Sequence, residues 1–338
     1  MVNFTILAGG FSTFVATYQT TTGDNPSWIA SHPQNISVLY AVNENYPVGS
    51  LQSFLMNPDG GLTLADTVTS RGAGPTFTNP LSTGEVTAMN FGSPNCSLVA
   101  TMPNDPLHFQ TDSPVVEFPV NGGPSNPHMS LEHKEEVLVS DFVHGILFVV
   151  NELTSTLTAQ HIPEAPNGTT LPLIANVSII PEDFKSKSSF AGAEILISKP
   201  TQKFPDSLIY VSNRNTGPNF DPRGDSIAIF EFASSSPILR AHARQWQIRE
   251  DDTPQPVGPT AQAQVSGDLI LQTQVFTGLR QIRSMTLGRV DDGGDEYLIA
   301  GANLDGGVAM FRRVDGGHNL TLVARNTEVA NRTSFVFV

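Results

Sequence analysis

The sequence predicts an all-β fold, a β-propeller of four-stranded antiparallel blades. Three observations support this prediction. No stretch keeps the apolar spacing of an amphipathic helix over several turns, a short apolar run recurs along the chain, and turn-forming residues are abundant, with 28 Gly and 25 Pro among 338 residues. We expect a single domain over residues 1–338, with six blades or with seven of which one is incomplete.

The recurring run is apolar and ends in a small or polar residue. Its clearest copies are Leu39–Glu44, Leu147–Glu152, Ile209–Arg214 and Tyr297–Asn303. Runs without polar alternation are typical of strands covered on both faces, so we predict that these are the inner strands of blades. An alternating strand follows after a turn, as in Gly49–Phe54 and Asp225–Phe230. This order is the meander of one propeller blade.

The spacing of the copies is uneven. The run Val137–Asp141 precedes Leu147–Glu152 by only about ten residues, whereas a full blade takes about 40–45 residues. We therefore predict that part of a blade is missing between Asp141 and Gly145. The segment 234–272 is instead longer than a blade turn and is rich in charged residues and proline, which predicts a surface insertion or a disordered loop.

The composition limits the partners. A formal net charge of −14 and the absence of long basic runs disfavour nucleic acid and anionic membranes. Cys96 is the only cysteine, so an intrachain disulfide is excluded. The first residues lack the basic region of a signal peptide, which favours a cytoplasmic location. Seven Asn-x-Ser/Thr sequons keep secretion as the alternative.

Several motifs, in their order, resemble a known family. They are Pro26–Pro33, Gly72-Ala73-Gly74-Pro75, Asn126-Pro127-His128-Met129 and Gln281–Met285. Together they resemble the lactonase family of seven-bladed β-propellers, which includes propeller-type 6-phosphogluconolactonases and fungal carboxy-cis,cis-muconate lactonizing enzymes. The resemblance spans most of the chain. It implies a cofactor-free site in a central cleft that acts on a small anionic sugar lactone or muconate-like acid.

The resemblance also implies catalytic residues. In the muconate enzymes the site uses a His, a Glu and two Arg, and these positions fall on His128, Glu152 and, for one Arg, Arg214. The second Arg belongs to a Gly-Pro-Arg-His turn, where this sequence has Phe142-Val143-His144-Gly145. The site arginine is therefore absent at the place where the spacing indicates missing chain.

We expect Arg283, Glu194 and Glu44 to bind substrate. Lactone hydrolysis needs a base that activates water and cations that stabilise the oxyanion, and a guanidinium also binds a carboxylate or phosphate. No metal is expected, because the Cys and His residues lack metal-ligand spacing. The acidic turn Asp291–Glu296 lacks the spacing of a calcium loop and is predicted to be a solvated hairpin tip.

Three functions remain open from the sequence. The first is a lactonase or a lactone-forming isomerase. The second is a propeller that binds a ligand without catalysis. The third is an inactive family member that lacks one site arginine. The sequence predicts no oligomeric state.

Overall fold

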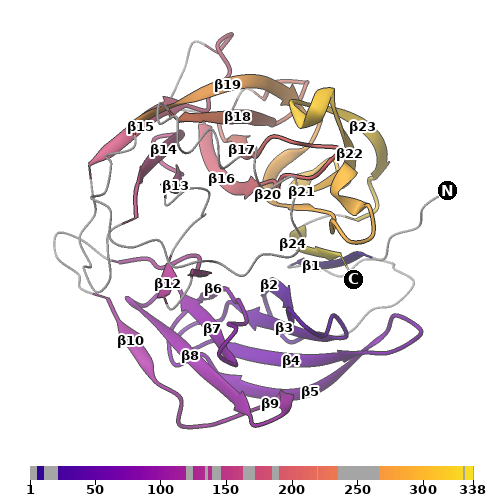
Figure 1. The fold of residues 1–338 in the computed structure, drawn as a ribbon. Coiled ribbons are helices and arrows are strands. Elements are labelled where there is room, and N and C mark those ends of the chain that lie inside the picture. Colours follow the sequence, from indigo (N-terminus) through magenta and orange to yellow (C-terminus); the bar gives the residue numbers. More distant parts are fainter. Residues whose placement is uncertain are drawn as a thin grey trace.

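The described residues form seven antiparallel sheets arranged in a ring (Figure 1). The computed structural model describes residues 6–10, 22–118, 125–133, 136–138, 146–162, 172–184, 190–218, 220–234, 266–329 and 332–337. Over these ranges there is no α-helix, only short 3₁₀ turns such as η2 (Gly294–Glu296) and η3 (Asp315–Gly317). Accordingly, none of the described segments is a helix of the length and apolarity needed to span a bilayer. The predicted all-β propeller is confirmed.

Three sheets have four strands each, and one has five. The four-stranded sheets are β2 (Pro26–Ser31), β3 (Val38–Asn43), β4 (Ser50–Met56) and β5 (Leu62–Thr69); β16 (Phe190–Ile197), β17 (Leu208–Asn215), β18 (Ser226–Ser234) and β19 (Gly267–Phe276); and β20 (Arg280–Leu287), β21 (Tyr297–Asp305), β22 (Val308–Val314) and β23 (Asn319–Asn326). The five-stranded sheet contains β6 (Pro75–Phe77), β7 (Glu85–Asn90), β8 (Asn95–Met102), β9 (Asp105–Phe109) and β10 (Val115–Glu117). Each four-stranded sheet is a meander, as the sequence predicts, whereas in the five-stranded sheet β9 and β10 both pair with β8.

The apolar runs form the second strands of the complete sheets, so their assignment as inner strands was wrong. β2, β16 and β20 lie nearest the axis, and β3, β17 and β21 follow outward (Figure 1). β3 is buried at every position, whereas only one residue of β2 is fully buried. The reason is that a second strand has neighbours on both edges and both faces, while the innermost strand has one edge turned to the axis.

Two neighbouring sheets are smaller. β11 (Leu131–His133) and β12 (Glu136–Leu138) form a two-stranded sheet, and β13 (Ile146–Asn151), β14 (Thr156–His161) and β15 (Leu173–Ser178) form a three-stranded one. Among the described residues, no strand pairs with the second edge of β13. These two sheets flank the point where the spacing predicts missing chain, and they agree with a ring of seven blades that is incomplete there.

The hydrophobic core lies between neighbouring sheets. One cluster joins β17 and β18 to β20–β22 and contains Leu208, Ile229 and Phe311, all at most 1% exposed. A second joins β13 and β14 to β17 and β18 through Phe148 and Phe230. Because each sheet covers its neighbour, no single blade could bury its faces alone.

The ring is closed by two strands from opposite ends of the sequence. β1 (Ile6–Gly10) pairs antiparallel with β24 (Arg332–Phe337). The Ser334 hydroxyl oxygen accepts a hydrogen bond from the Ile29 backbone N–H at 3.1 Å, which joins β24 to β2. The predicted insertion 234–272 is shorter than expected, because residues 267–272 belong to β19; residues 235–265 lie outside the described residues.

Candidate active site

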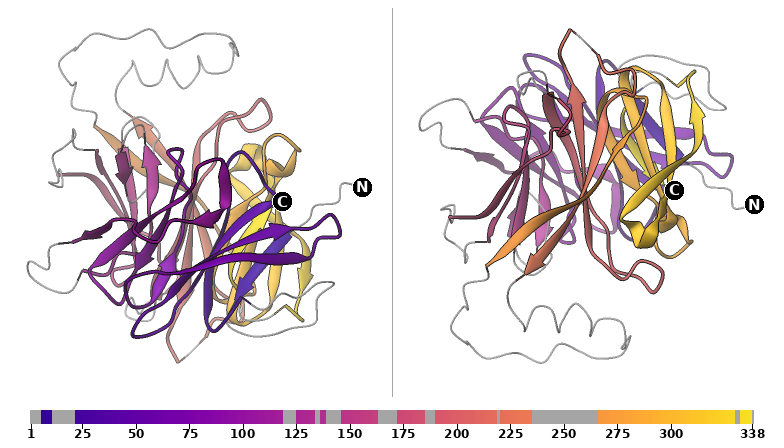
Figure 2. Two further views of the ribbon diagram at one scale, coloured as in Figure 1. Left: turned by 90° about the horizontal axis from the view of Figure 1, so that it is seen from below. Right: turned by 90° about the horizontal axis from the view of Figure 1, so that it is seen from above.

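The strand directions bring the predicted site residues to one end of the ring. Neighbouring strands are antiparallel, so the end of each second strand lies beside the beginning of the innermost one: Asn215 pairs with Phe190, and Asp305 with Arg280. Seen from the side, the strands run between two end faces (Figure 2). We call the face where β3, β13, β17 and β21 end the site face. Glu44, Glu152 and Arg214 all lie there.

Arg214 and Glu152 form an ion pair between two sheets. Arg214 Nη2 donates to Glu152 Oε1 at 2.5 Å and to the Gly192 carbonyl oxygen at 3.2 Å. The Arg214 side chain is 12% exposed and that of Glu152 is 58% exposed. The Arg214 guanidinium is therefore largely enclosed by protein, while the Glu152 carboxylate remains accessible to solvent.

His128 lies within the field of these two groups and of Arg283. The residue is exposed to solvent, and desolvation by the surrounding protein lowers the pKa of its imidazole. Arg283 and Arg214 lower that pKa further by charge repulsion, while Glu152 opposes them. The imidazole is thus neutral at neutral pH and can accept a proton. The structure brings together His128, Glu152, Arg214 and Arg283, which we call the His128 site.

Asp225 fixes the spacing of the two arginines, a role that sequence analysis did not find. Its carboxylate accepts a hydrogen bond from the Asn215 N–H at 2.8 Å and another from the Ile282 N–H at 2.8 Å. These residues directly follow Arg214 and precede Arg283 in the chain. Burial raises the pKa of Asp225 to about 6. The backbone N–H donors and Arg214 lower this pKa, because they favour the ionised carboxylate, but their effect is smaller. A Gly-Asp turn after a strand is too common a pattern to reveal this role.

Glu194 is placed apart from this group. It lies at an irregularity where β16 shifts its register against β17 between Gly192 and Ile195, and it is 4% exposed. Its carboxylate accepts a hydrogen bond from the Ile195 N–H at 3.3 Å. Burial raises the pKa of this carboxyl to about 8. A buried, largely neutral carboxyl does not suit the predicted role of a substrate contact.

Glu44 lies at the end of β3 and is half-buried. Its Oε2 accepts a hydrogen bond from the Ser27 hydroxyl at 2.9 Å, within its own sheet. Among the described residues it makes no hydrogen bond or ion pair with a member of the His128 site. The Phe142–Gly145 segment, which replaces the Gly-Pro-Arg-His turn, lies outside the described residues.

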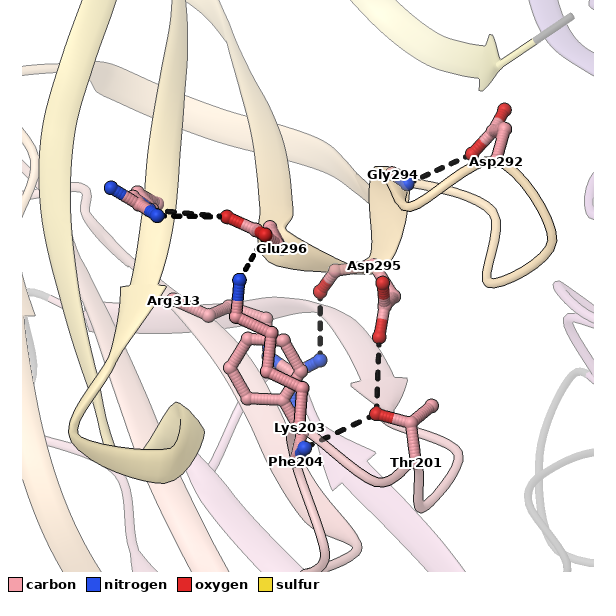
Figure 3. A network of polar contacts seen from close by, with 9 residues as sticks. Thr201, Lys203, Phe204, Asp292, Gly294, Asp295, Glu296 and Arg313 are labelled. Atoms are coloured by element: carbon pink, nitrogen blue, oxygen red, sulfur yellow. Dashed lines mark hydrogen bonds and ion pairs between the residues drawn. The ribbon is translucent and has the colours of Figure 1, made fainter. Parts of the chain in front are cut away.

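The acidic turn precedes β21 and therefore lies on the end face opposite the site face. Figure 3 shows its contacts with basic and polar groups. Glu296 pairs with Lys203 and with Arg312, and Asp291 pairs with Arg289. The tip itself, Asp291–Gly293, is exposed as predicted, whereas Asp295 and Glu296 are half-buried. In the part of the chain that the structure describes, no group of three or more His, Cys, Asp or Glu side chains has the arrangement of a metal site.

Sequence analysis also did not find the aromatic residues near the His128 site. The Phe91 ring meets His128 edge to face, with centroids 5.9 Å apart. The Arg280 guanidinium stacks over Phe220, 3.5 Å from the ring centroid. An aromatic residue in a turn of small and polar residues, such as Asn90-Phe91-Gly92, was the available signal.

Comparison with solved structures supports the fold. A protein from Lactobacillus plantarum shares 14% identity over 98% of both chains, with a TM-score of 0.67. A periplasmic gluconolactonase from Pseudomonas aeruginosa shares 12% identity over 99% of both chains, with a TM-score of 0.65. A Bacteroides fragilis protein described as a candidate 6-phosphogluconolactonase shares 15% identity over 95% of this chain and 89% of its own, with a TM-score of 0.63.

A search of curated protein sequences gives no match. The family profile described as lactonase, 7-bladed beta-propeller, matches residues 12–129 and 111–254, which is more than half of the chain. The protein therefore belongs to the lactonase family of seven-bladed β-propellers.

Proposed function

We propose that this protein hydrolyses a small anionic lactone at the His128 site, without a metal ion. The observation that carries the proposal is the convergence of a neutral imidazole, an accessible carboxylate and two guanidinium groups. Family membership supports lactone chemistry in general. Two cations beside one carboxylate repel a divalent metal ion and attract an anionic substrate, which favours metal-independent catalysis.

The proposed mechanism assigns His128 as general base. Its imidazole takes a proton from water while the water oxygen attacks the lactone carbonyl carbon. Arg283 and Arg214 stabilise the negative charge on the carbonyl oxygen and bind the substrate anion. The ring C–O bond then breaks, and the imidazolium returns the proton to the leaving oxygen, giving a hydroxy acid.

Glu152 is assigned a supporting role. Because it is ion-paired with Arg214, its carboxylate orients that guanidinium and favours the imidazolium that forms on His128. His128, rather than Glu152, is therefore assigned as the general base.

The test is hydrolysis of 6-phosphogluconolactone and glucono-1,5-lactone above the spontaneous rate. We expect His128→Asn to lower kcat by about 10²- to 10⁴-fold and Glu152→Gln to lower it by a smaller factor. Arg289→Gln, which breaks the ion pair with Asp291 on the opposite face, is the matched control and should leave activity unchanged. Unchanged turnover in His128→Asn contradicts the mechanism.

A non-catalytic binding function is the second candidate. The observation that favours it is the incomplete sheet beside Glu152, at the position of the absent arginine turn. It predicts that the wild-type protein binds these lactones or their acids, measured by calorimetry, without turnover. Cyclisation of carboxymuconate is the other enzymatic alternative and is tested by loss of its diene absorbance.

A further inference from the structure

The site face carries exposed apolar side chains at the turns that surround the His128 site. They are Tyr46 in the β3–β4 turn, Phe91 in the β7–β8 turn, Leu153 in the β13–β14 turn, Phe220 in the β17–β18 turn and Leu304 at the end of β21. Single exposed apolar residues are ordinary on protein surfaces. Here five sheets each contribute one at this end of the ring, and one of them, Phe91, contacts His128 directly.

Phe91 contacts the catalytic imidazole. The two rings meet at an interplanar angle of 84°, with Phe91 at the edge-to-face distance given above. The Asn126 side-chain amide donates to the Phe91 carbonyl oxygen at 2.7 Å, which holds the segment that carries His128 against this turn. The other side of Phe91 remains exposed to solvent.

Tyr46 extends this aromatic surface away from His128. Its ring rests on two glycines: a Cβ at Gly92 would lie 2.5 Å from Tyr46 Cε1, and a Cβ at Gly74 would lie 2.5 Å from the Tyr46 hydroxyl oxygen. Gly74 also has a φ of +56°, which favours glycine. Two positions without side chains thus accommodate a ring that is still 62% exposed. We call Tyr46 and Phe91 the aromatic row.

We propose that the aromatic row recognises an apolar ring on the substrate, so that the His128 site prefers aryl-substituted lactones to polyhydroxylated sugar lactones. This inference rests on the proposed function and specifies its substrate class. With the lactone carbonyl at His128 and its anionic group at the arginines, an attached ring packs on Phe91 and reaches Tyr46. A sugar lactone instead presents hydroxyl groups to these rings, where they lose water without gaining partners.

The test compares kcat/KM for four lactones: 3,4-dihydrocoumarin, a carboxylated dihydrocoumarin, glucono-1,5-lactone and 6-phosphogluconolactone. We expect the carboxylated dihydrocoumarin to be the best substrate. Phe91→Ala and Tyr46→Ala should each raise KM for the aryl lactones by roughly 10- to 100-fold and change KM for the sugar lactones by less than about 3-fold. Leu64→Ala, an exposed apolar residue on the outer strand β5, is the control and should change neither.

The ratio between substrates separates specificity from damage to the site. If Phe91→Ala only displaces His128, all four lactones lose kcat equally, and the inference is overturned. Tyr46→Ala provides an independent check, because it alters no residue in contact with His128. Phe91→Leu provides another, because its apolar side chain should partly restore the KM for the aryl lactones. Equal or better turnover of the sugar lactones by the wild-type protein also overturns the inference while leaving the proposed function intact. Absence of turnover with all four lactones contradicts the proposed function itself.

Discussion

The two sides of the ring differ in how their sheets are built. The sheets β16–β19 and β20–β23 each have four strands and share a continuous core, whereas β11–β12 and β13–β15 have two and three strands among the described residues. The His128 site lies across this boundary. Arg214 and Arg283 lie on strands of the complete side, whereas His128 lies in the segment before β11 and Glu152 in the turn after β13. The difference teaches that the anion-binding groups rest on sheets with more strand pairing than the proton-transferring groups do, and we expect them to be held more rigidly.

Hydrogen exchange should show the difference directly. We expect amides in β17 and β21 to exchange on the order of 100-fold more slowly than those in β11 and β12, because strands with neighbours on both edges open only with the whole sheet. Mass spectrometry of peptides after deuterium labelling measures this ratio. Equal protection of the amides in both regions would contradict a difference in rigidity between the two sides of the ring.

Asp225→Ala should be the most damaging single change on the complete side. It leaves the Asn215 and Ile282 N–H groups without their acceptor in a buried position, so we expect a loss of about 2–4 kcal/mol in the free energy of unfolding. Activity of the folded fraction should fall as well, because both arginines lose their support. Denaturant unfolding followed by assay tests both effects. If the variant is as stable as wild type but less active, Asp225 positions the two arginines without stabilising the fold.

Arg313 joins the complete sheets at the opposite face (Figure 3). It is 3% exposed, stacks over Phe204 at 4.0 Å, and donates to the Tyr210 hydroxyl oxygen and the Asp295 carbonyl oxygen, each at 2.9 Å. We expect Arg313→Met to lower stability by about 2–3 kcal/mol. The neighbouring exposed pair makes Arg312→Met a control, with a cost of about 0–1 kcal/mol. If both variants lose the same free energy of unfolding, burial of the Arg313 side chain does not explain its contribution to stability.

The buried carboxyl of Glu194 should make the complete side sensitive to pH. In the folded protein its pKa is about 8, against an ordinary value of 4.5 in the unfolded chain. Between these values unfolding releases a proton, so stability falls as the pH rises and the loss is complete above pH 8. We expect Glu194→Gln to gain about 1–3 kcal/mol relative to wild type between pH 5 and pH 8. Thermal unfolding of both proteins across this range tests it; parallel curves contradict it.

The smallest expected effect is on the titration of His128. Removing a neighbouring cation favours the imidazolium, so Arg283→Gln should raise the His128 pKa. Glu152→Gln should lower this pKa, because a carboxylate that favours the imidazolium is lost. Nuclear magnetic resonance of the imidazole C–H signals measures both shifts. Shifts of the same sign in the two variants would contradict the arrangement of the site.

The sequence predicted the all-β blades, but it did not predict which strand of each blade lies nearest the axis or how deeply single side chains are buried. The run Ile209–Arg214 shows that a strand is covered on both faces, but coverage does not say which strand is nearest the axis. Glu194 could not be recognised as a buried group, because its position depends on a register shift between two strands. The place of the Tyr46 ring could not be predicted either, because the ring packs against Gly74 and Gly92, which are distant from Tyr46 in the sequence.

Closure of the ring by β1 and β24 has a consequence for biosynthesis. Gly10 pairs with Arg332, so β1 must await a strand that is made roughly 320 residues later. At about 5–20 residues per second, translation of the intervening chain takes roughly 20–60 s. Throughout that interval β1 is an unpaired strand on a nascent polypeptide, which is the form most prone to associate with other chains. Cellular factors that shield such strands should therefore matter more for this protein's yield than for its final stability.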